Sequence, residues 1–550
     1  MNVAELVGRT LARLGVGHAF GVIGSGNFNA TNALRAEGVP FTAARHEGGA
    51  ATMADAYARM SDRVAVLSTH QGCGLTNALT GIAEAAKSRT PLIALAADTA
   101  SSAVLSNFRV DQDGLAAAVG AIPMRVHGAA TAVHDTMRAY RTASQQRRAV
   151  VLNLPLDVQA QQVPDDALSD VDTIAPLAPI RPDASTVAAL ADLIADARRP
   201  VFIAGRGARH GAEPLRALAD TCGALLATSA VANGLFHGDP WALGISGGFS
   251  SPLAAELISG ADLVVGWGCA LNMWTTRHGR LIDAGAWLAQ VDTDQAAIGA
   301  HRPVDLGVLG DVASTAADVR SEFLARPHVG TGYRDDKLAA RIAADIRWNG
   351  VEHPDLSTPQ HIDPRTLSRA LDDLLPRERV VAVDSGNFMG YPSAYLSVPD
   401  ENGFCFTQAF QSIGLGLATA IGAALAQPGR LPVAALGDGG FHMSLVELET
   451  AVRLGIPLVV VVYNDAAYGA EVHHFTDASG SELDTVVFPD TDIAAIGRGF
   501  GCTGVTVRTP DDLSGVTDWL AGRRDTPLVV DAKIARDGGS WWLADAFQRH

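Results

Sequence analysis

Residues 432–471 read PVAALGDGGFHMSLVELETAVRLGIPLVVVVYNDAAYGAE, and this stretch decides the fold. An apolar run ends at a glycine-rich turn, a stretch with helical spacing follows, and a second apolar run ends at Asp465. Unalternating runs of β-branched residues separated by a helix are typical of parallel strands buried on both faces. The segment therefore predicts a strand–helix–strand unit of a parallel sheet.

Apolar runs of the same kind recur along the whole chain. They are VAVL (64–67), PLIALAAD (91–98), AVVLNLP (149–155), PVFIAG (200–205), DLVVGWG (262–268), VVAVD (380–384) and PLVVDAK (527–533). Stretches with helical spacing separate them, as in EGGAATMADAYAR (47–59). We therefore predict an α/β fold built from doubly wound parallel sheets.

The chain is expected to divide into three domains. At 550 residues it is too long for one hydrophobic core. Two stretches rich in proline and charge, residues 160–186 and 326–364, interrupt the alternation and indicate connections between domains. We place the domains at residues 1–165, 187–325 and 362–550.

The composition narrows the class of protein. The net charge is −17, and a field of that sign repels nucleic acid and anionic membranes. The five cysteines are scattered and form no CxxC pair, which argues against a disulfide framework. Residues 1–16 have the spacing of an amphipathic helix instead of the continuous apolar centre of a signal peptide, and no apolar run approaches membrane-spanning length. We expect a cytoplasmic protein with neither a nucleic-acid nor a membrane partner.

The turn GDGG (437–440) combines the features of a phosphate site and a metal site. Its glycines allow a tight turn whose N–H groups can face a ligand closely, and a following helix start favours phosphate. Asp438 offers a hard oxygen to Mg²⁺, and Asp465 offers a second from the tip of the next strand. We also interpret Ser444 and Glu447 as a capping box that starts the helix. Alone, GDGG would favour a plain strand–helix–strand unit with a solvated acid, and the acid at the tip of the second strand reverses that preference.

The whole element resembles a known motif. A GDG turn, a helical stretch and the pair Asn464-Asp465 are similar to the thiamine diphosphate (ThDP) motif of acetolactate synthase, pyruvate decarboxylase and benzoylformate decarboxylase. Many members carry Asn-Asn where this chain has Asn-Asp, and the added charge is expected to strengthen metal binding. The resemblance implies Mg²⁺ ligation by Asp438, Asp465 and the carbonyl of Ala467. It implies cofactor contacts at Gly437, Asp438, Gly439, Gly440, Asp465 and Ala467.

The resemblance covers nearly the full chain and is nearest to acetolactate synthase. It implies a pyrimidine-binding domain at 1–165, a central Rossmann-like domain at 187–325 and a diphosphate-binding domain at 362–550. The segment TAARHEGGAATMADAYAR (42–59) matches the family's glutamate segment, with Glu47 as the residue that hydrogen-bonds the aminopyrimidine and activates the thiazolium ring. A carboxylate is favourable at a helix N-terminus, so capping of its own helix is the alternative role for Glu47.

Two further segments match regions that surround the cofactor in this family. FQSIGLGLATAIGAAL (410–425) resembles the segment that bends the cofactor, with Ile413 beneath the two rings and the carbonyl of Gln411 accepting from the 4′-amino group. STHQGCGLTNALTGIAEA (68–85) places His70 where benzoylformate decarboxylase has a catalytic histidine. A neutral histidine at a strand end can relay protons near neutral pH, although a structural role is the plainer reading.

Other residues are candidates for contact with the substrate. Ser25 and Asn27 lie in the glycine-rich stretch VIGSGNF, and Gln112 matches a glutamine that points into the same cavity in acetolactate synthase. Glu471 lies six residues past Asp465, where pyruvate decarboxylases place a catalytic glutamate. The glycine-rich turn needs no such role for Ser25 or Asn27, and Glu471 has a solvated position as its alternative.

The resemblance implies ThDP- and Mg²⁺-dependent decarboxylation of a small 2-oxo acid with carboligation to a carbonyl acceptor. One alternative is a simple 2-oxo acid decarboxylase that releases an aldehyde, which His70 and Glu471 favour. Another is an FAD-dependent enzyme resembling pyruvate oxidase, for which the lone Gly-x-Gly of AGRGARHG (204–211) is weak support. Relatives build each site between the first domain of one chain and the last domain of another, so a homodimer or homotetramer is implied.

Overall fold

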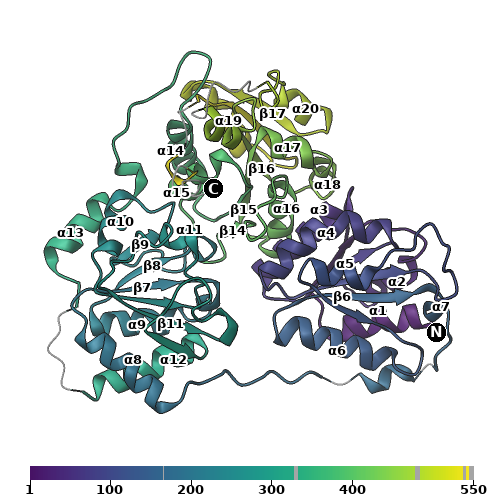
Figure 1. The fold of residues 1–550 in the computed structure, drawn as a ribbon. Helices are drawn as coiled ribbons and strands as arrows, with labels where there is room; N and C mark the ends of the chain where they lie inside the picture. The colour runs from purple at the N-terminus through teal and green to yellow at the C-terminus, as the bar shows by residue number, and fades with distance from the viewer. Residues whose placement is uncertain (165, 172, 327–331, 477–483, 537–539, 544–550) are drawn as a thin grey trace.

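The computed structural model describes residues 1–550 except 165, 172, 327–331, 477–483, 537–539 and 544–550. Three six-stranded sheets, in each of which every strand pair is parallel, follow one another along the chain (Figure 1). The predicted α/β class with three doubly wound sheets is confirmed. Each of the three ranges expected for the domains holds one sheet, while the exact boundaries remain a prediction. No helix among the described residues is long and apolar enough to cross a bilayer.

The first sheet has the strand order β2-β1-β3-β4-β6-β5. Its strands are β1 (His18–Gly21), β2 (Phe41–Ala43), β3 (Ala65–Thr69), β4 (Leu92–Asp98), β5 (Ile122–Arg125) and β6 (Ala149–Pro155). Its helices are α1 (Val3–Arg13), α2 (Phe28–Ala36), α3 (Glu47–Ser61), α4 (Cys73–Lys87), α5 (Gln112–Ala118), α6 (Ala132–Gln145) and α7 (Leu156–Gln159). Leu67 of β3 packs with α3 and α4, whereas its neighbour Val66 packs with α1, α2 and α6. Because successive strand residues face opposite sides, covering both faces requires the continuous apolar runs of the sequence.

The central sheet has the order β12-β11-β10-β7-β8-β9. Its strands are β7 (Pro200–Ala204), β8 (Leu225–Thr228), β9 (Ala242–Ile245), β10 (Leu263–Trp267), β11 (Trp287–Asp292) and β12 (Leu306–Leu309). Its helices are α8 (Ala184–Asp196), α9 (Ala212–Cys222), α10 (Pro252–Ser259), α11 (Met273–Thr276), α12 (Val312–Leu324) and α13 (Asp336–Asp345). Part of the expected connection 326–364 is thus a helix, because Ile342 of α13 packs into the core of this domain.

The last sheet, β14-β13-β15-β16-β18-β17, repeats the topology of the first. Its strands are β13 (Arg379–Val383), β14 (Phe404–Phe406), β15 (Leu431–Gly437), β16 (Val459–Asn464), β17 (Thr503–Val507) and β18 (Leu528–Lys533). Its helices are α14 (Pro364–Leu374), α15 (Gly390–Tyr395), α16 (Gly416–Ala426), α17 (Asp438–Ser444), α18 (Glu447–Arg453), α19 (Gly469–Thr476), α20 (Ile493–Gly499) and α21 (Ser514–Ala521). The short 3₁₀ helices are η1 (Ala167–Asp170), η2 (Arg206–Ala208), η3 (Ala230–Ala232), η4 (Gln295–Ala297), η5 (Trp348–Gly350), η6 (Asn387–Met389) and η7 (Pro510–Leu513).

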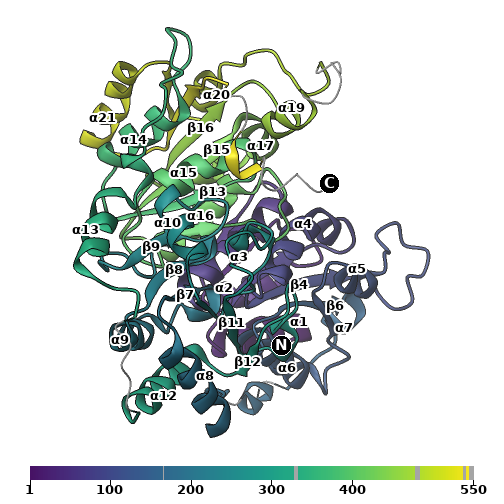
Figure 2. The ribbon, with the colours of Figure 1, turned by 60° about the vertical axis from the view of Figure 1, so that its left-hand side comes forward.

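The first and last domains share one hydrophobic core. Helices α3 and α4 of the first domain and α16 of the last lie side by side in both views (Figure 1, Figure 2). Gly422 of α16 lies so close to the carbonyl of Met53 in α3 that a Cβ there would clash. This close packing explains the glycine and alanine content of α16.

The predicted capping box at Ser444 and Glu447 is wrong. Helix α17 begins at Asp438 directly after β15, and Ser444 lies at its end, where its hydroxyl donates to the carbonyl of Gly440. The buried carboxylate of Glu447 instead accepts the backbone N–H groups of Arg45, at 3.2 Å, and His46, at 3.0 Å. Helix α17 therefore starts at the glycine turn itself, and Glu447 binds backbone N–H groups of the first domain.

Candidate active site

Asp438 and Asp465 lie together at the ends of neighbouring strands. Strands β15 and β16 pair in parallel, with Gly437 opposite Tyr463, so the residues that follow each strand meet at one edge of the sheet. The two carboxyl groups lie close enough for the charge of Asp438 to act on Asp465. Burial, and for Asp465 also the neighbouring charge of Asp438, raise the pKa of both carboxyl groups. This is the arrangement that the sequence predicted, and a divalent cation would neutralise it.

Close neighbours leave no room for a side chain at two glycines of the turn. A Cβ on Gly439 would lie 2.7 Å from the ring of Tyr468, and one on Gly440 would overlap the carboxylate of Asp384. The residue before the helix, Gly437, has no side chain that could cover the N–H groups at the helix start. The backbone N–H groups of the turn can therefore approach a bound phosphate closely.

The carbonyl of Ala467 fits the role of a third oxygen ligand. The preceding residue, Ala466, has a φ of 52°. On either side of Ala467, the Tyr468 N–H donates to the carbonyl of Val486, and the Phe488 N–H donates to the carbonyl of Ala466. Among the described residues, no hydrogen bond uses the Ala467 carbonyl. Two carboxylates and a carbonyl form an all-oxygen set of the kind that could hold Mg²⁺.

Glu47 is the first residue of α3 and is half-buried. The helix is capped by its neighbour, because Nδ1 of His46 accepts the Gly48 N–H at 3.0 Å. The carboxylate of Glu47 is left to accept a 3.1 Å hydrogen bond from the side-chain amide of Asn77 on α4. The capping alternative is thus not what the geometry shows, and Asn77 is a partner that the sequence reading missed.

His70 follows β3 and contacts the loop that carries Ser25. Its Nδ1 accepts the Gly26 N–H at 3.2 Å, and its ring meets the edge of Phe108 with 5.2 Å between centroids. Accepting at Nδ1 places the proton of the neutral imidazole on Nε2. Ser25 itself is exposed in the same loop.

Asn27 lies within the hydrogen-bond network of its own loop. Its buried side chain accepts the Gly24 N–H at 2.8 Å and donates to the carbonyl of Val22 at 3.1 Å and to the hydroxyl of Ser68 at 3.0 Å. Both N–H groups of the amide are thus used in shaping the loop. A substrate contact at Asn27 stays a prediction.

Gln112 is also buried within the scaffold. Its carbonyl accepts the Gly72 N–H at 2.9 Å, and its amide donates to Ala97 O at 3.1 Å and to Asn153 Oδ1 at 2.7 Å. These bonds fix the turn between His70 and α4, where Gly72 has a φ of 64°. They place Gln112 in support of this turn instead of pointing into a cavity.

The loop that carries Gln411 and Ile413 is held at both ends by carboxylates. At its start, Glu84 of α4 accepts the backbone N–H of Phe410 at 2.7 Å. At its end, Asp384 accepts the backbone N–H of Gly414 at 2.9 Å. Burial raises the pKa of Asp384 to about 6. Between these anchors Gln411 is exposed with a φ of 64°, and Ile413 is half-buried.

Glu84 and Asp384 are site residues that the sequence reading missed. Glu84 is fully buried and pairs with the guanidinium of Arg59 at 2.7 Å, and Arg59 also pairs with Asp55 at 2.6 Å. A charged residue inside the otherwise apolar stretch GIAEAA was the signal for Glu84. Its partner loop, more than three hundred residues away, left no local pattern.

Glu471 lies in the first turn of α19 and is exposed. Its backbone N–H donates to the carbonyl of Tyr468 at 3.1 Å. Helix α19 begins at Gly469, shortly after Asp465 at the end of β16. Among the described residues, no hydrogen bond or ion pair joins Glu47 to Asp438, Asp465 or Glu471. Whether a second chain brings these groups together stays a prediction.

Three models of one protein family match successive parts of the chain. The N-terminal TPP binding domain of thiamine pyrophosphate enzymes matches residues 1–117, the central domain 187–319 and the C-terminal TPP binding domain 384–532. Thiamine pyrophosphate is the same molecule as ThDP. The two terminal matches cover the segments that hold Glu47 and Asp438.

Curated relatives are similar along nearly their whole length. Sulfoacetaldehyde acetyltransferase of Castellaniella defragrans is 28% identical, over 100% of this chain and 96% of that protein. A probable 2-ketoarginine decarboxylase, AruI, of Pseudomonas aeruginosa is 30% identical, over 93% of this chain and 90% of that protein. Pyruvate oxidase of Lactiplantibacillus plantarum is 25% identical, over 96% of this chain and 88% of that protein. The chain therefore belongs to the thiamine diphosphate-dependent enzyme family.

Proposed function

We propose that this enzyme uses ThDP and Mg²⁺ to decarboxylate a 2-oxo acid and to transfer the remaining acyl unit to a second carbonyl compound. The observation that carries the proposal is the pair formed by the buried Asp438 and the half-buried Asp465 beside a glycine turn. The similarity to a protein named as an acetyltransferase favours transfer of the acyl unit to an acceptor over its release as an aldehyde. The 2-oxo acid and its acceptor remain to be found by assay.

The proposed site has two halves with different functions, one in the last domain and one in the first. Asp438, Asp465 and the Ala467 carbonyl would hold Mg²⁺, and the N–H groups of the 437–440 turn would receive the diphosphate. When bound, ThDP supplies a carbon nucleophile and a store for the electron pair released with CO₂. Glu47 would hold a proton at the aminopyrimidine, and Asn77 keeps its carboxylate in place from 3.1 Å.

Gln411 and Ile413 would shape the pocket around the two rings. The backbone of this loop is fixed by Glu84 and Asp384, so its exposed tip has a defined position despite its lack of helix or strand. A preorganised loop lowers the entropy cost of binding. Ser25, His70 and Glu471 are the residues proposed to meet the substrate.

A second candidate is a simple decarboxylase that releases an aldehyde. It is favoured by His70, whose Nδ1 is occupied by the Gly26 N–H, so that Nε2 carries the transferable proton. The similarity to a protein named as a 2-ketoarginine decarboxylase points the same way. An FAD-dependent oxidase has support from the similarity to pyruvate oxidase and, weakly, from the lone Gly-x-Gly in residues 204–211. A purified protein without flavin absorbance would eliminate it.

We also propose a homodimer or homotetramer with each site shared between two chains. Large apolar side chains are exposed in the first and last domains: Leu105 is 96% exposed, Phe28 53% and Met443 55%. A partner chain could cover such groups. Light scattering on the purified protein measures the subunit number.

One assay separates the candidate reactions. The purified enzyme with ThDP and Mg²⁺ is given a panel of 2-oxo acids and sulfoacetaldehyde, alone and in pairs, and CO₂ and carbon products are followed. A hydroxyketone or acetohydroxy acid supports transfer, whereas an aldehyde as the sole product supports the decarboxylase. The Glu47→Gln variant, prepared identically, shows which products depend on this site.

A further inference from the structure

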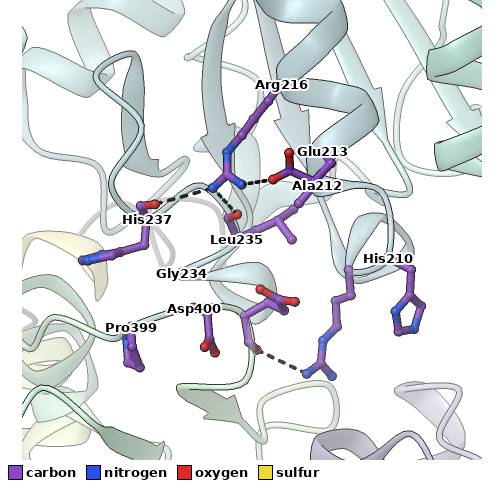
Figure 3. Close-up of a pocket in the computed structure, with 11 residues that line it drawn as sticks. His210, Ala212, Glu213, Arg216, Gly234, Leu235, His237, Pro399 and Asp400 are labelled. Atoms are coloured by element: carbon purple, nitrogen blue, oxygen red, sulfur yellow. Dashed lines mark hydrogen bonds and ion pairs between the residues drawn. The ribbon is translucent and has the colours of Figure 1, made fainter.

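A cavity with a volume of about 530 Å³ lies between the central and last domains, and the two arginines that line it are bonded within the chain (Figure 3). Arg216 contacts Glu213 at 2.9 Å and donates to the carbonyl of Leu235 at 3.0 Å. Arg209 donates to backbone carbonyls and to Oδ1 of Asn402. Because both guanidinium groups already have acceptors, they do not point to a ligand. The polar network that does indicate a function lies beside the proposed metal site.

A fully buried acidic residue, Asp531, lies on β18 next to the strand that leads into the metal loop, as we call residues 465–467. Strands β16 and β18 pair in parallel, with Asp531 opposite Val462 and Lys533 opposite Asn464. Because side chains alternate along a strand, Asn464, Asp531 and Lys533 project from the same face of the sheet. Asp531 is 0% exposed and Asn464 4%. Asp531 therefore lies beside the last residue of β16, directly before the metal loop.

The carboxylate of Asp531 is held from three directions. Its Oδ1 accepts the side-chain amide of Asn464 at 2.9 Å. Its Oδ2 accepts the backbone N–H of Ile493, the first residue of α20, at 3.1 Å and lies 3.0 Å from the ammonium group of Lys533. A buried carboxylate is costly unless it is paired and hydrogen-bonded, and here both conditions are met. The position of the carboxylate is therefore well defined.

Asn464 connects Asp531 to the metal loop. Its Nδ2 faces Asp531, and its Oδ1 accepts the backbone N–H of Ala466 at 3.0 Å. An ionised carboxylate can only accept hydrogen bonds, so Asp531 fixes which end of the amide faces it and leaves the amide oxygen for Ala466. An amide in place of Asp531 could either accept or donate, and it would not impose this orientation.

Ala466 needs such a restraint because its backbone is left-handed. Its φ is 52°, a conformation that residues other than glycine rarely adopt. Asn464 holds its N–H, and its carbonyl accepts the N–H of Phe488 at 2.8 Å. These two bonds fix the peptide groups on both sides of Ala466, which join it to Asp465 and Ala467. The orientation of Ala466 therefore determines how the Asp465 carboxylate and the Ala467 carbonyl approach a cation.

We propose that Asp531 is a positioning residue of the metal site, which acts through Asn464 on the loop that carries Asp465 and Ala467. Lys533 supports this role by compensating the charge of the buried carboxylate. The inference rests on the proposed function, because it assigns to Asp531 an effect on Mg²⁺ bound by the metal loop. Groups that hydrogen-bond to the ligands of a metal, or orient them, tune the affinity for that metal.

The Mg²⁺ requirement of ThDP binding tests this proposal without relying on turnover. Full-length enzyme dialysed free of ThDP and Mg²⁺ is titrated with ThDP in a calorimeter at a series of Mg²⁺ concentrations, and urea unfolding of the same protein is measured in parallel. The variants are Asp531→Asn, Asn464→Ala and the two combined.

Asp372→Asn is the matched control. The side chain of Asp372 is 7% exposed, pairs with Arg379 and accepts the backbone N–H of Ser397 at 2.8 Å. Arg379 is the first residue of β13, so this pair lies at the opposite end of the parallel sheet from the metal loop. The control therefore removes a similar charge from the same domain at a distance from the proposed metal site.

Asp531→Asn and Asn464→Ala should each raise the Mg²⁺ concentration needed for half-maximal ThDP binding by about tenfold. The combined variant should show no larger shift than either single variant, because both changes break the same chain of hydrogen bonds. Asp372→Asn should unfold at lower urea concentration but keep the Mg²⁺ requirement of the wild type. An unshifted Mg²⁺ requirement in Asp531→Asn or Asn464→Ala, or shifts that multiply in the combined variant, would overturn the proposal.

The test holds even if Asp531→Asn does not fold. Asn464→Ala keeps the Asp531–Lys533 pair, so its Mg²⁺ requirement then decides by the same criterion. A wild-type enzyme that binds no ThDP, or binds it equally without Mg²⁺, would refute the proposed function and this role of Asp531 with it. A wild type that needs Mg²⁺ beside variants with unshifted requirements would refute the role of Asp531 alone.

Discussion

Glu84, on a helix of the first domain, accepts a 2.7 Å hydrogen bond from the backbone N–H of Phe410 in the last domain. Its other carboxylate oxygen accepts the N–H of Ala409 at 3.1 Å. The same helix, α4, carries Asn77 about two turns earlier, where it holds Glu47. One helix therefore positions both the proposed activating carboxylate and the loop proposed to bend the cofactor.

The substitution Glu84→Gln should weaken both the fold and cofactor binding. It leaves Arg59 with less negative charge nearby and turns an amide toward backbone N–H groups, so we expect a loss of about 3 kcal/mol in the free energy of unfolding. The Kd for ThDP should also rise, because the loop of Gln411 loses its anchor. Urea unfolding and ThDP titration measure the two effects.

Glu378→Gln is the control, since Glu378 is 68% exposed and 3.7 Å from Arg430. Removing such an exposed pair should change the free energy of unfolding by less than about 1 kcal/mol. A Glu84→Gln variant that is less stable but binds ThDP as the wild type does would limit Glu84 to a structural role.

Glu47→Gln should separate binding from turnover. The amide keeps the shape of the side chain but cannot take a proton, so kcat should fall by about 100-fold or more while ThDP still binds. Steady-state kinetics and ThDP titration measure the two quantities. Glu37→Gln, a change of the same kind at a surface residue of the first domain, should leave both unaltered. Retained turnover in Glu47→Gln would refute the activating role.

Mg²⁺ binding should release a proton and strengthen as the pH rises. The pKa of Asp465 is raised by burial and by Asp438, so the metal-free pair retains a proton that the cation must displace. For a carboxyl group with a raised pKa, the native state binds more protons than the unfolded state, so the metal-free protein should lose stability as the pH rises.

Calorimetry in two buffers of different ionisation enthalpy counts the released protons. Asp465→Asn is the control, because an amide at this position removes the shared proton and should flatten the pH dependence of stability. Mg²⁺ affinity that does not vary with pH would show that the two carboxyl groups are not coupled in the way described.

Mixed subunits should recover activity if each site spans two chains. Glu47→Gln and Asp438→Asn chains are each expected to be nearly inactive, but a mixed dimer carries one site with both residues intact. Equal mixing after reversible dissociation should then restore about a quarter of wild-type activity. Activity no higher than that of the separate variants would place both residues in the site of a single chain.

The sequence predicted what depends on local pattern. Unalternating apolar runs gave the parallel strands, and the acids just past two such runs gave Asp438 and Asp465, because parallel strands end at a common edge. It failed where a side chain meets a distant partner. Glu447 looked like a local cap but binds the backbone of Arg45. The bonds of Asn27 to Ser68 and of Gln112 to Asn153 likewise left no local pattern.

Metal-dependent cofactor binding is measured most directly by the affinity for ThDP with and without Mg²⁺ in the wild type and in Asp438→Asn. Tight ThDP binding should require Mg²⁺, and Asp438→Asn should raise the ThDP concentration needed for half-saturation by about tenfold or more at fixed Mg²⁺. Equal ThDP affinity in the two proteins, or wild-type binding that is indifferent to Mg²⁺, would contradict metal-dependent binding.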